Sequence, residues 1–313
     1  MTNASDNHLM DKRFSASTRI GTRTLVQLRE LAAHISLRQT RKIYSPLSGQ
    51  HVAAVRGRGL EYAEVRQYQP GDDIRTMDWR VTARTGQAHI KVFQEELERP
   101  LLIVCDLRAS MFFGSRRTFK QVLAADLCAL LAWAGVHSGD RVGALIFNDD
   151  QQFDLRPGSG THQVLKIINR LATMPRSAAQ DPVTRMTSIC QQLRRVAHPG
   201  TAIWIISDWN GIDDQQQPLL FDLCRHCDVR AIQIYDQLEQ DLPPPGHYEL
   251  TDGLQRLQLD AANPTQRQRW QQLARERQQH LQQYLQRLKV PLLPIATDDD
   301  PLARLRLFCG GRS

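Results

Sequence analysis

Two unbroken apolar runs that end on polar side chains stand out along the chain. Leu101 to Cys105 is entirely apolar and stops at Asp106, and Thr201 to Ile206 is nearly so and ends on Ser207 and Asp208. Neither run alternates apolar with polar positions, as a strand with one face in water would. We therefore predict two strands buried on both faces, the pattern typical of a parallel sheet between two helical layers.

The same apolar patterning predicts further strands and helices in alternation. Short apolar runs predict strands at 89–94, 141–148, 230–235 and 290–297, an edge or hairpin strand at 153–156 and a hairpin at 248–259. Helical spacing of apolar residues predicts helices at 119–136, 162–171, 184–195 and 301–308, and a long helix that starts at Pro264. Strands that alternate with helices indicate an α/β fold with a doubly wound, mostly parallel sheet.

The region before residue 96 differs from the rest in composition and apolar patterning, which predicts a division of the chain. Residues 1–20 are polar and predict a disordered tail. Residues 21–95 predict a helical and β extension, which begins with apolar residues at helical spacing from Leu25 to Ile35. That stripe must pack on another element, which the pattern does not identify. Residues 96–313 form the predicted α/β domain.

Composition excludes several classes of protein. The chain has 313 residues, 41% of them hydrophobic, and its 40 Lys and Arg against 33 Asp and Glu give a formal charge of +7. The basic residues are not gathered in a recognition module, so we expect no nucleic-acid partner. No apolar stretch approaches the roughly 20 residues of a membrane span, and residues 1–19 lack a signal peptide's apolar core. We expect a cytoplasmic protein without membrane insertion.

The first candidate site lies where the run at 101–106 ends. In open parallel sheets, ligands bind outside the carboxyl ends of the strands. Asp106 and Ser110 would place oxygen atoms there, the ligand type that Mg²⁺ prefers. The alternative interpretation is that Asp106 and Asp208 only cap the elements that follow their strands.

Two sets of residues carry a resemblance to known families. A sheet of this order, with Asp-x-x-x-Ser after one central strand and Ile-Ser-Asp after a later one, resembles the von Willebrand factor A fold, which is Rossmann-like. From about Leu25 to Phe308 the chain more closely resembles the bacterial family called domain of unknown function fifty-eight. The specific motif is Arg66-x-Tyr68-x-Pro70-Gly71-Asp72-Asp73-x-Arg75-x-x-Asp78-Trp79, followed by Ala83-Arg84 and by Asp106-x-x-x-Ser110-Met111. Members are typically encoded beside AAA+ ATPases of the MoxR type, so the resemblance implies such a partner.

The von Willebrand resemblance also implies a divalent-metal site. That fold usually binds a metal through an Asp-x-Ser-x-Ser run, a Thr and a second Asp, which correspond here to Asp106, Ser110, Thr184 and Asp208. Where the first Ser would stand this chain has Arg108, a permanent cation. A guanidinium between the two aspartates could take the place of the metal, so we expect Mg²⁺ binding to be weak or absent. In the rival geometry Arg108 turns to solvent and the metal binds as usual.

The arginines of the motif, Arg108 and Trp209 are candidate interaction residues. Arg66, Arg75 and Arg84 could form a docking or anion-binding surface, but we favour internal pairing with the nearby carboxylates of Asp72, Asp73 and Asp78. We expect Trp79 to anchor this block on the sheet. Trp209, directly after Asp208, could be exposed beside the site, where aromatic residues serve as binding hot spots.

Two classes of function remain. The chain has no Gly-x-x-x-x-Gly-Lys loop, no dinucleotide fingerprint and no Gly-x-Ser-x-Gly elbow. The favoured hypothesis is a non-enzymatic adaptor that presents its strand-end face to an acidic residue of a MoxR-type ATPase. The alternative is a metal-dependent hydrolase or phosphate-transfer enzyme that uses Asp106 and Asp208. Catalysis would also need a general base, and the sequence offers no candidate.

Overall fold

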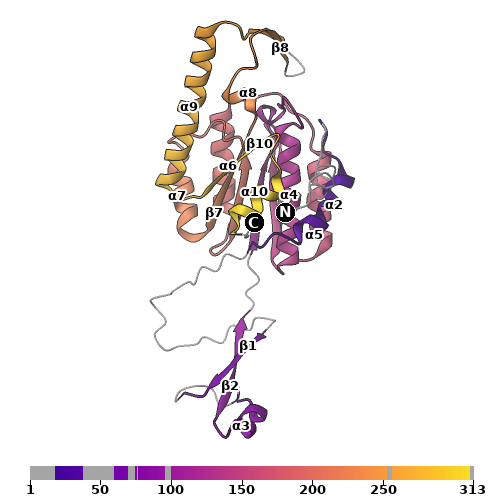
Figure 1. Ribbon diagram of the computed structural model, residues 1–313, viewed down its shortest axis with the longest axis vertical. Coiled ribbons are helices and arrows are strands. Elements are labelled where there is room, and N and C mark those ends of the chain that lie inside the picture. The colour runs from indigo at the N-terminus through magenta and orange to yellow at the C-terminus, as the bar shows by residue number, and fades with distance from the viewer. Residues whose placement is uncertain are drawn as a thin grey trace, which may run out of the picture. The chain divides into compact units, whose positions relative to one another are not determined.

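The computed structural model describes residues 18–37, 60–69, 75, 77–95, 100–251 and 256–310 (Figure 1). Its contacts divide the chain into two units. Unit 1 comprises Met1–Thr40 and Arg99–Ser313, and unit 2 comprises Arg41–Glu98. The candidate metal residues all belong to unit 1.

Unit 1 is built on a six-stranded sheet in the order β10-β7-β6-β3-β4-β5. Neighbouring strands are parallel except for the edge pair β4 and β5, which is antiparallel. The strands are β3 (Pro100–Asp106), β4 (Arg141–Phe147), β5 (Gln152–Gly158), β6 (Ala202–Ser207), β7 (Asp228–Tyr235) and β10 (Leu292–Ala296). The predicted α/β class, the mostly parallel sheet and the edge hairpin are confirmed.

The strand order places a switch point between β3 and β6. From β3 the chain moves outward to β4 and β5, then returns to β6 and moves outward in the other direction. The connections on either side of this point leave the sheet in opposite directions, and in open sheets of this kind ligands bind at the carboxyl ends of the strands beside such a point. Asp106 ends β3 and Asp208 follows β6, so both predicted aspartates lie at this switch point.

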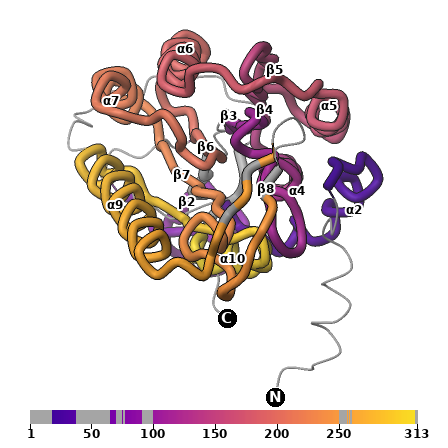
Figure 2. Tube along the Cα trace, turned by 90° about the horizontal axis from the view of Figure 1, so that it is seen from above, coloured from indigo at the N-terminus to yellow at the C-terminus, as the bar shows by residue number. Residues whose placement is uncertain are grey.

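Helices cover both faces of the sheet (Figure 2). One face is covered by α2 (Thr22–Ala32), α4 (Lys120–His137), α5 (Thr161–Thr173) and α10 (Pro301–Phe308). The other is covered by α6 (Pro182–Val196), α7 (Gln217–His226) and the C-terminal half of α9 (Pro264–Arg287). Two apolar cores result, one on each side of the buried strands.

Helix α2 covers the outer side of α4. Helix α4 is buried nearly all round, because the sheet takes one side and α2 packs on another. The indole Nε1 of Trp133 donates to the carbonyl of Leu25 at 3.1 Å, and the guanidinium of Arg29 lies 5.4 Å from the Trp133 ring centroid. The predicted division at residues 21–95 is therefore wrong for this helix, which packs with the α/β domain.

The short helix α8 (Gln237–Gln240) and the hairpin of β8 (His247–Thr251) and β9 (Arg256–Asp260) separate β7 from α9. The hairpin was predicted, although its expected turn at Asp252 and Gly253 lies outside the described residues. Helix α9 rises past the carboxyl edge of the sheet toward this hairpin (Figure 1). Its buried residues, Leu281, Tyr284 and Leu285, all lie in the C-terminal half, whereas Leu273 in the N-terminal half is exposed.

Unit 2 contains β1 (Leu60–Gln67), α3 (Trp79–Thr85) and β2 (His89–Glu95). The two strands pair antiparallel, and the carboxylate of Asp78 caps α3 by accepting from the backbone N–H groups of Arg80 and Val81. The helix ends at Gly86, whose positive φ suits a residue without a side chain. In the described ranges of both units, no helix is both long enough and apolar enough to cross a membrane.

Candidate functional site

The centre of the site is a buried ion pair between neighbouring residues. Asp106 is fully buried at the end of β3, and the side chain of Arg108 folds back onto its carboxylate. Nη2 of Arg108 lies 2.8 Å from Oδ2, and Nε lies 3.0 Å from Oδ1. This two-point geometry is the strongest form of the charge-assisted hydrogen bond between arginine and a carboxylate. The hydroxyl of Ser207 donates to the same carboxylate at 2.7 Å.

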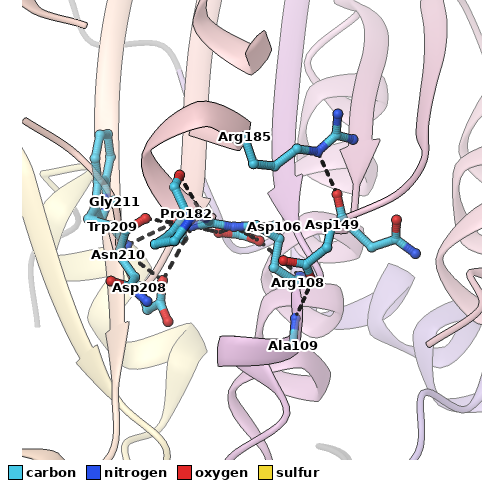
Figure 3. Close-up of polar contacts among 12 residues, drawn as sticks. Asp106, Arg108, Ala109, Asp149, Pro182, Arg185, Asp208, Trp209, Asn210 and Gly211 are labelled. Atoms are coloured by element: carbon cyan, nitrogen blue, oxygen red, sulfur yellow. Dashed lines mark hydrogen bonds and ion pairs between the residues drawn. The ribbon is translucent and has the colours of Figure 1, made fainter. Parts of the chain in front are cut away.

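The Arg108 guanidinium reaches from the end of β3 toward the loop after β6 (Figure 3). Its Nη2 donates to the carbonyl of Asn210 at 3.0 Å and lies 3.7 Å from Oδ1 of Asp208. Its Nη1 donates to the carbonyl of Pro182, at the start of α6, at 3.4 Å. The cation therefore lies between the two strand-end aspartates, as in one of the two predicted geometries, and only 2% of its side chain is exposed.

A second buried cation, Lys120, neutralises the other side of Asp208. Its Nζ lies 3.0 Å from Oδ2 of Asp208 and 2.6 Å from Oε1 of Glu239 on α8. The Lys120 side chain is 1% exposed. Lys120 is the first residue of α4, where a positive charge is unfavourable to the helix dipole. The carboxylates of Asp208 and Glu239 compensate for this unfavourable interaction and for the cost of burying the ammonium.

These contacts shift the pKa values of the paired groups. Burial alone would raise the pKa of Asp208, but the charges of Lys120 and Arg108 and the Asn210 N–H lower it to about 2. Burial would lower the pKa of Lys120, but Asp208 and Glu239 outweigh it and raise that pKa above its ordinary value. The pKa of Arg108 is raised in the same way by Asp106 and then Asp208. All three groups are charged near neutral pH.

A third aspartate fixes the loop that carries Arg108. Asp149 follows β4, and its Oδ2 accepts from the backbone N–H of Ala109 at 2.7 Å and from the hydroxyl of Ser177 at 2.9 Å. Arg185 on α6 donates to the carbonyl of Asn148 at 2.8 Å (Figure 3). The loops after β3 and β4 and the start of α6 are thus joined around the site, which limits the freedom of Arg108.

Two predicted metal ligands lie outside this ion-pair network. The Ser110 hydroxyl is buried and has no hydrogen-bond partner within the described ranges. Thr184 is exposed in the first turn of α6, where its hydroxyl donates to Asp181, the N-cap of that helix. Of the four residues named for the metal, the structure joins Asp106 and Asp208 through Arg108, places Ser110 near Asp208 without a hydrogen bond to either aspartate, and uses Thr184 in the cap of α6.

The prediction that Trp209 is exposed is wrong. Trp209 is 4% exposed, and its indole Nε1 donates to the carbonyl of Ile232 at 3.1 Å. Its φ of 60° reverses the chain directly after Asp208, and its backbone N–H donates to Ser207 Oγ at 2.9 Å. Trp209 thus packs the loop onto the core and offers no surface to a partner.

The candidate arginines lie in unit 2. Arg75 and Arg84 are exposed, and Arg66 is half-buried with its Nη1 donating to the carbonyl of Gln67 at 3.2 Å. Trp79, predicted to anchor the block, is 68% exposed. Pro70 to Asp73 lie outside the described residues, so the predicted pairing of the arginines with Asp72 and Asp73 is not visible.

A cavity of about 580 Å³ opens beside the ion pairs. It lies between the strand ends and α9, and its lining includes Ser110, Asp208, Glu239 and Gln233. This size is within the range of ligand pockets. Sequence reasoning identified neither this cavity nor Lys120, although a lysine at the head of a mostly apolar helix is a signal for a buried ion pair.

Comparison with known proteins gives a consistent family match. The family model described as "Protein of unknown function DUF58" matches residues 64–280. An uncharacterized protein of Mycobacterium bovis is 30% identical over 279 residues, which cover 89% of this chain and 87% of the relative, and one from Mycobacterium tuberculosis matches equally well.

Two solved structures are also similar. The conserved hypothetical protein BatB from Bacteroides thetaiotaomicron aligns with a TM-score of 0.42 at 14% identity, over 68% of this chain and 96% of that one. An aerotolerance-related membrane protein from Bacteroides fragilis aligns with a TM-score of 0.43 at 12% identity, over 67% of this chain and 96% of that one.

Proposed function

This chain belongs to the DUF58 family, and from that premise we propose that it is a non-enzymatic protein-interaction module. It acts as an adaptor for a MoxR-type AAA+ ATPase, which it binds through the strand-end face of a von Willebrand A-like domain in the cytoplasm. The family resemblance supplies the identity of the ATPase. We prefer binding over catalysis because the two strand-end aspartates are already paired with Arg108 and Lys120.

The observation that carries the proposal is the position of the Arg108 guanidinium. It lies on Asp106 and 3.7 Å from Asp208, while Lys120 holds the other oxygen of Asp208. Both aspartates are therefore already neutralised by side chains of the chain itself. Their oxygens are poorly placed to bind Mg²⁺, which requires oxygen ligands at close range and is repelled by two neighbouring cations.

The same contacts disfavour the alternative, a metal-dependent hydrolase or phosphate-transfer enzyme. A general base must be able to take up a proton near neutral pH. The pKa of Asp208 is lowered to about 2, so its carboxylate is a poor base. Asp106 is fully buried under Arg108, where a substrate would have to displace a two-point ion pair to reach it.

A binding assay on two matched variants tests the proposal. Asn210 is exposed beside the site at the carboxyl end of the sheet, and His198 is exposed at the amino end, before β6. We expect the purified chain to bind the MoxR-type ATPase of the same cell in the presence of ATP, as measured by biolayer interferometry. Asn210→Trp should weaken binding at least tenfold, and His198→Trp should change it less than twofold.

Two results would count against the adaptor role. The first is no binding of the ATPase by the wild-type chain, with or without nucleotide. The second is equal binding by the wild type and Asn210→Trp, which would place the interface away from the strand-end face.

A further inference from the structure

The inward face of α9 changes character along its length. Gln271, Ala274 and Gln278 lie on the same helical stripe as Leu281 and Leu285, because they are spaced three and four residues apart. The two leucines are buried against the sheet, whereas the three residues before them line the 580 Å³ cavity. The stripe thus turns polar where α9 passes the strand ends.

The floor of this cavity contains polar atoms without partners. Gln233, near the end of β7, is 7% exposed, and its Nε2 donates to Oε1 of Gln278 at 2.9 Å. Its own Oε1 is buried with no hydrogen-bond partner in the described part of the chain, and so is the hydroxyl of Ser110. Buried polar atoms of this kind are costly unless they are satisfied. A ligand that brings N–H groups into the cavity would satisfy them.

The charges around the cavity leave an excess of arginine at its rim. Lys120 pairs with both Asp208 and Glu239, Arg108 pairs with Asp106 and lies 3.7 Å from Asp208, and Arg267 lies 3.0 Å from Asp241. Arg275 and Arg277 on α9 also line the cavity and are exposed. Within the described ranges neither of these two pairs with a carboxylate. The rim is therefore suited to an anionic group, and arginine binds carboxylates with particular specificity.

We propose that this cavity binds an extended acidic peptide segment of a partner protein, with its carboxylate on Arg275 or Arg277, which flank the helical stripe on opposite sides, and its backbone along the amide side chains. This deepens the proposed adaptor function and rests on it for the existence of a protein partner. Gln271 and Gln278 are seven residues apart, a span of about 10 Å along the helix. That length accommodates about three residues of extended chain.

The lining favours a peptide over a phosphorylated ligand. Glutamine side chains carry both a donor and an acceptor, which match the N–H and C=O groups of a peptide backbone. Three carboxylates also line the cavity, at Asp208, Glu239 and Asp241. Even when paired, these carboxylates would repel a nucleotide or nucleic acid, which carries several negative charges, more strongly than they would repel a ligand with one carboxylate.

The test uses the full-length chain and a peptide array that is independent of any ATPase. The probes are 12-residue peptides of randomised sequence. Each peptide that contains Asp or Glu has a matched control in which Asp is replaced by Asn and Glu by Gln. We expect the wild type to select acidic peptides over their amide counterparts. The double variant Arg275→Gln with Arg277→Gln should bind the selected peptides at least tenfold more weakly, as measured by fluorescence anisotropy.

Two further variants make the test specific to the cavity. Arg269→Gln removes the same charge from an exposed position of α9 outside the lining, and should change affinity less than twofold. Gln233→Met keeps the volume but removes the unpartnered acceptor, and should weaken binding about threefold to tenfold, the range of one hydrogen bond. Thermal melting confirms that each variant is folded.

The inference is overturned if the wild type shows no preference for acidic peptides, or if the Arg275 and Arg277 double variant binds them as well as Arg269→Gln does. Failure of the adaptor function gives a different pattern. In that case acidic peptides bind with the expected dependence on the two arginines, but the MoxR-type ATPase does not bind. If the ATPase binds and the double variant binds it equally well, the adaptor function stands and the cavity is not its docking site.

Discussion

The Nζ atom of Lys120 lies 3.0 Å from the carboxylate of Asp208, joining the start of α4 to the end of β6. The same ammonium also binds Glu239 on α8. Three segments that are distant in sequence thus depend on one buried charge for their relative position. The strand-end face is held together by ion pairs of the chain itself, and the first two predictions concern their energetics.

Replacing Lys120 should destabilise unit 1 strongly. Lys120→Met keeps most of the side-chain volume but removes the main counter-ion of Asp208, and removal of one partner of a buried pair typically costs about 3–5 kcal/mol. Urea denaturation followed by circular dichroism measures the free energy of unfolding. The control, Lys166→Met, changes an exposed lysine on α5 and should stay within about 0.5 kcal/mol of the wild type. Equal stability of the two variants would show that the Lys120 ion pairs contribute nothing.

The stability of the wild type should depend on pH through Asp208. Its folded pKa is lowered to about 2, below the unfolded value of about 4. The stabilising contribution is therefore fully present above about pH 4 and is lost as the pH falls toward 2. Asp208→Asn should flatten the fall in the free energy of unfolding across this window, measured by urea titrations at pH 5, 4, 3 and 2. An unchanged slope in Asp208→Asn would contradict the lowered pKa.

The arginines of unit 2 should affect binding more than stability. Because Arg84 and Trp79 are exposed on α3, Arg84→Ala and Trp79→Ala should change the free energy of unfolding by less than about 0.5 kcal/mol. If they form a docking surface, each should weaken ATPase binding, since exposed Trp and Arg are frequent hot-spot residues. Parallel melting and binding curves separate the two roles. A large loss of stability in Arg84→Ala would instead favour the internal ion network.

The sheet and the placement of its aspartates could be predicted from the sequence because buried strands are local apolar runs. The position of Arg108 between the aspartates was one of two geometries that the sequence allowed, and the hydrogen bonds to Asp106 decide between it and the geometry turned to solvent. Lys120 was missed because its partners are 88 and 119 residues away in the chain. The lysine at the start of a mostly apolar helix indicated a buried charge, but no local pattern identifies its distant partners.

For two other residues, the local backbone geometry rules out the role that their sequence position predicted. Thr184 follows the helix-opening pattern, but the Asp181 cap takes its hydroxyl, so the threonine belongs to the helix start. Trp209 follows a strand-end aspartate, but its positive φ turns the chain and the indole packs on the core. Both outcomes depend on backbone angles and capping contacts that residue identity alone does not specify.

If Arg108 occupies the place of a divalent cation between Asp106 and Asp208, its removal should allow Mg²⁺ to bind, which calorimetric titration with Mg²⁺ measures. We predict little or no saturable heat for the wild type and measurable affinity for Arg108→Ser, which removes the guanidinium and adds a hydroxyl beside Asp106. Arg116→Ser, an exposed change in the same loop, serves as the control and should behave as the wild type.

Because Arg108→Ser also leaves Asp106 without its buried partner, its melting temperature should be measured with and without Mg²⁺. A ligand that binds only the folded state raises the melting temperature, so Mg²⁺ should stabilise Arg108→Ser and leave the wild type unchanged. Tight Mg²⁺ binding by the wild type that Arg108→Ser leaves unaltered would contradict the account.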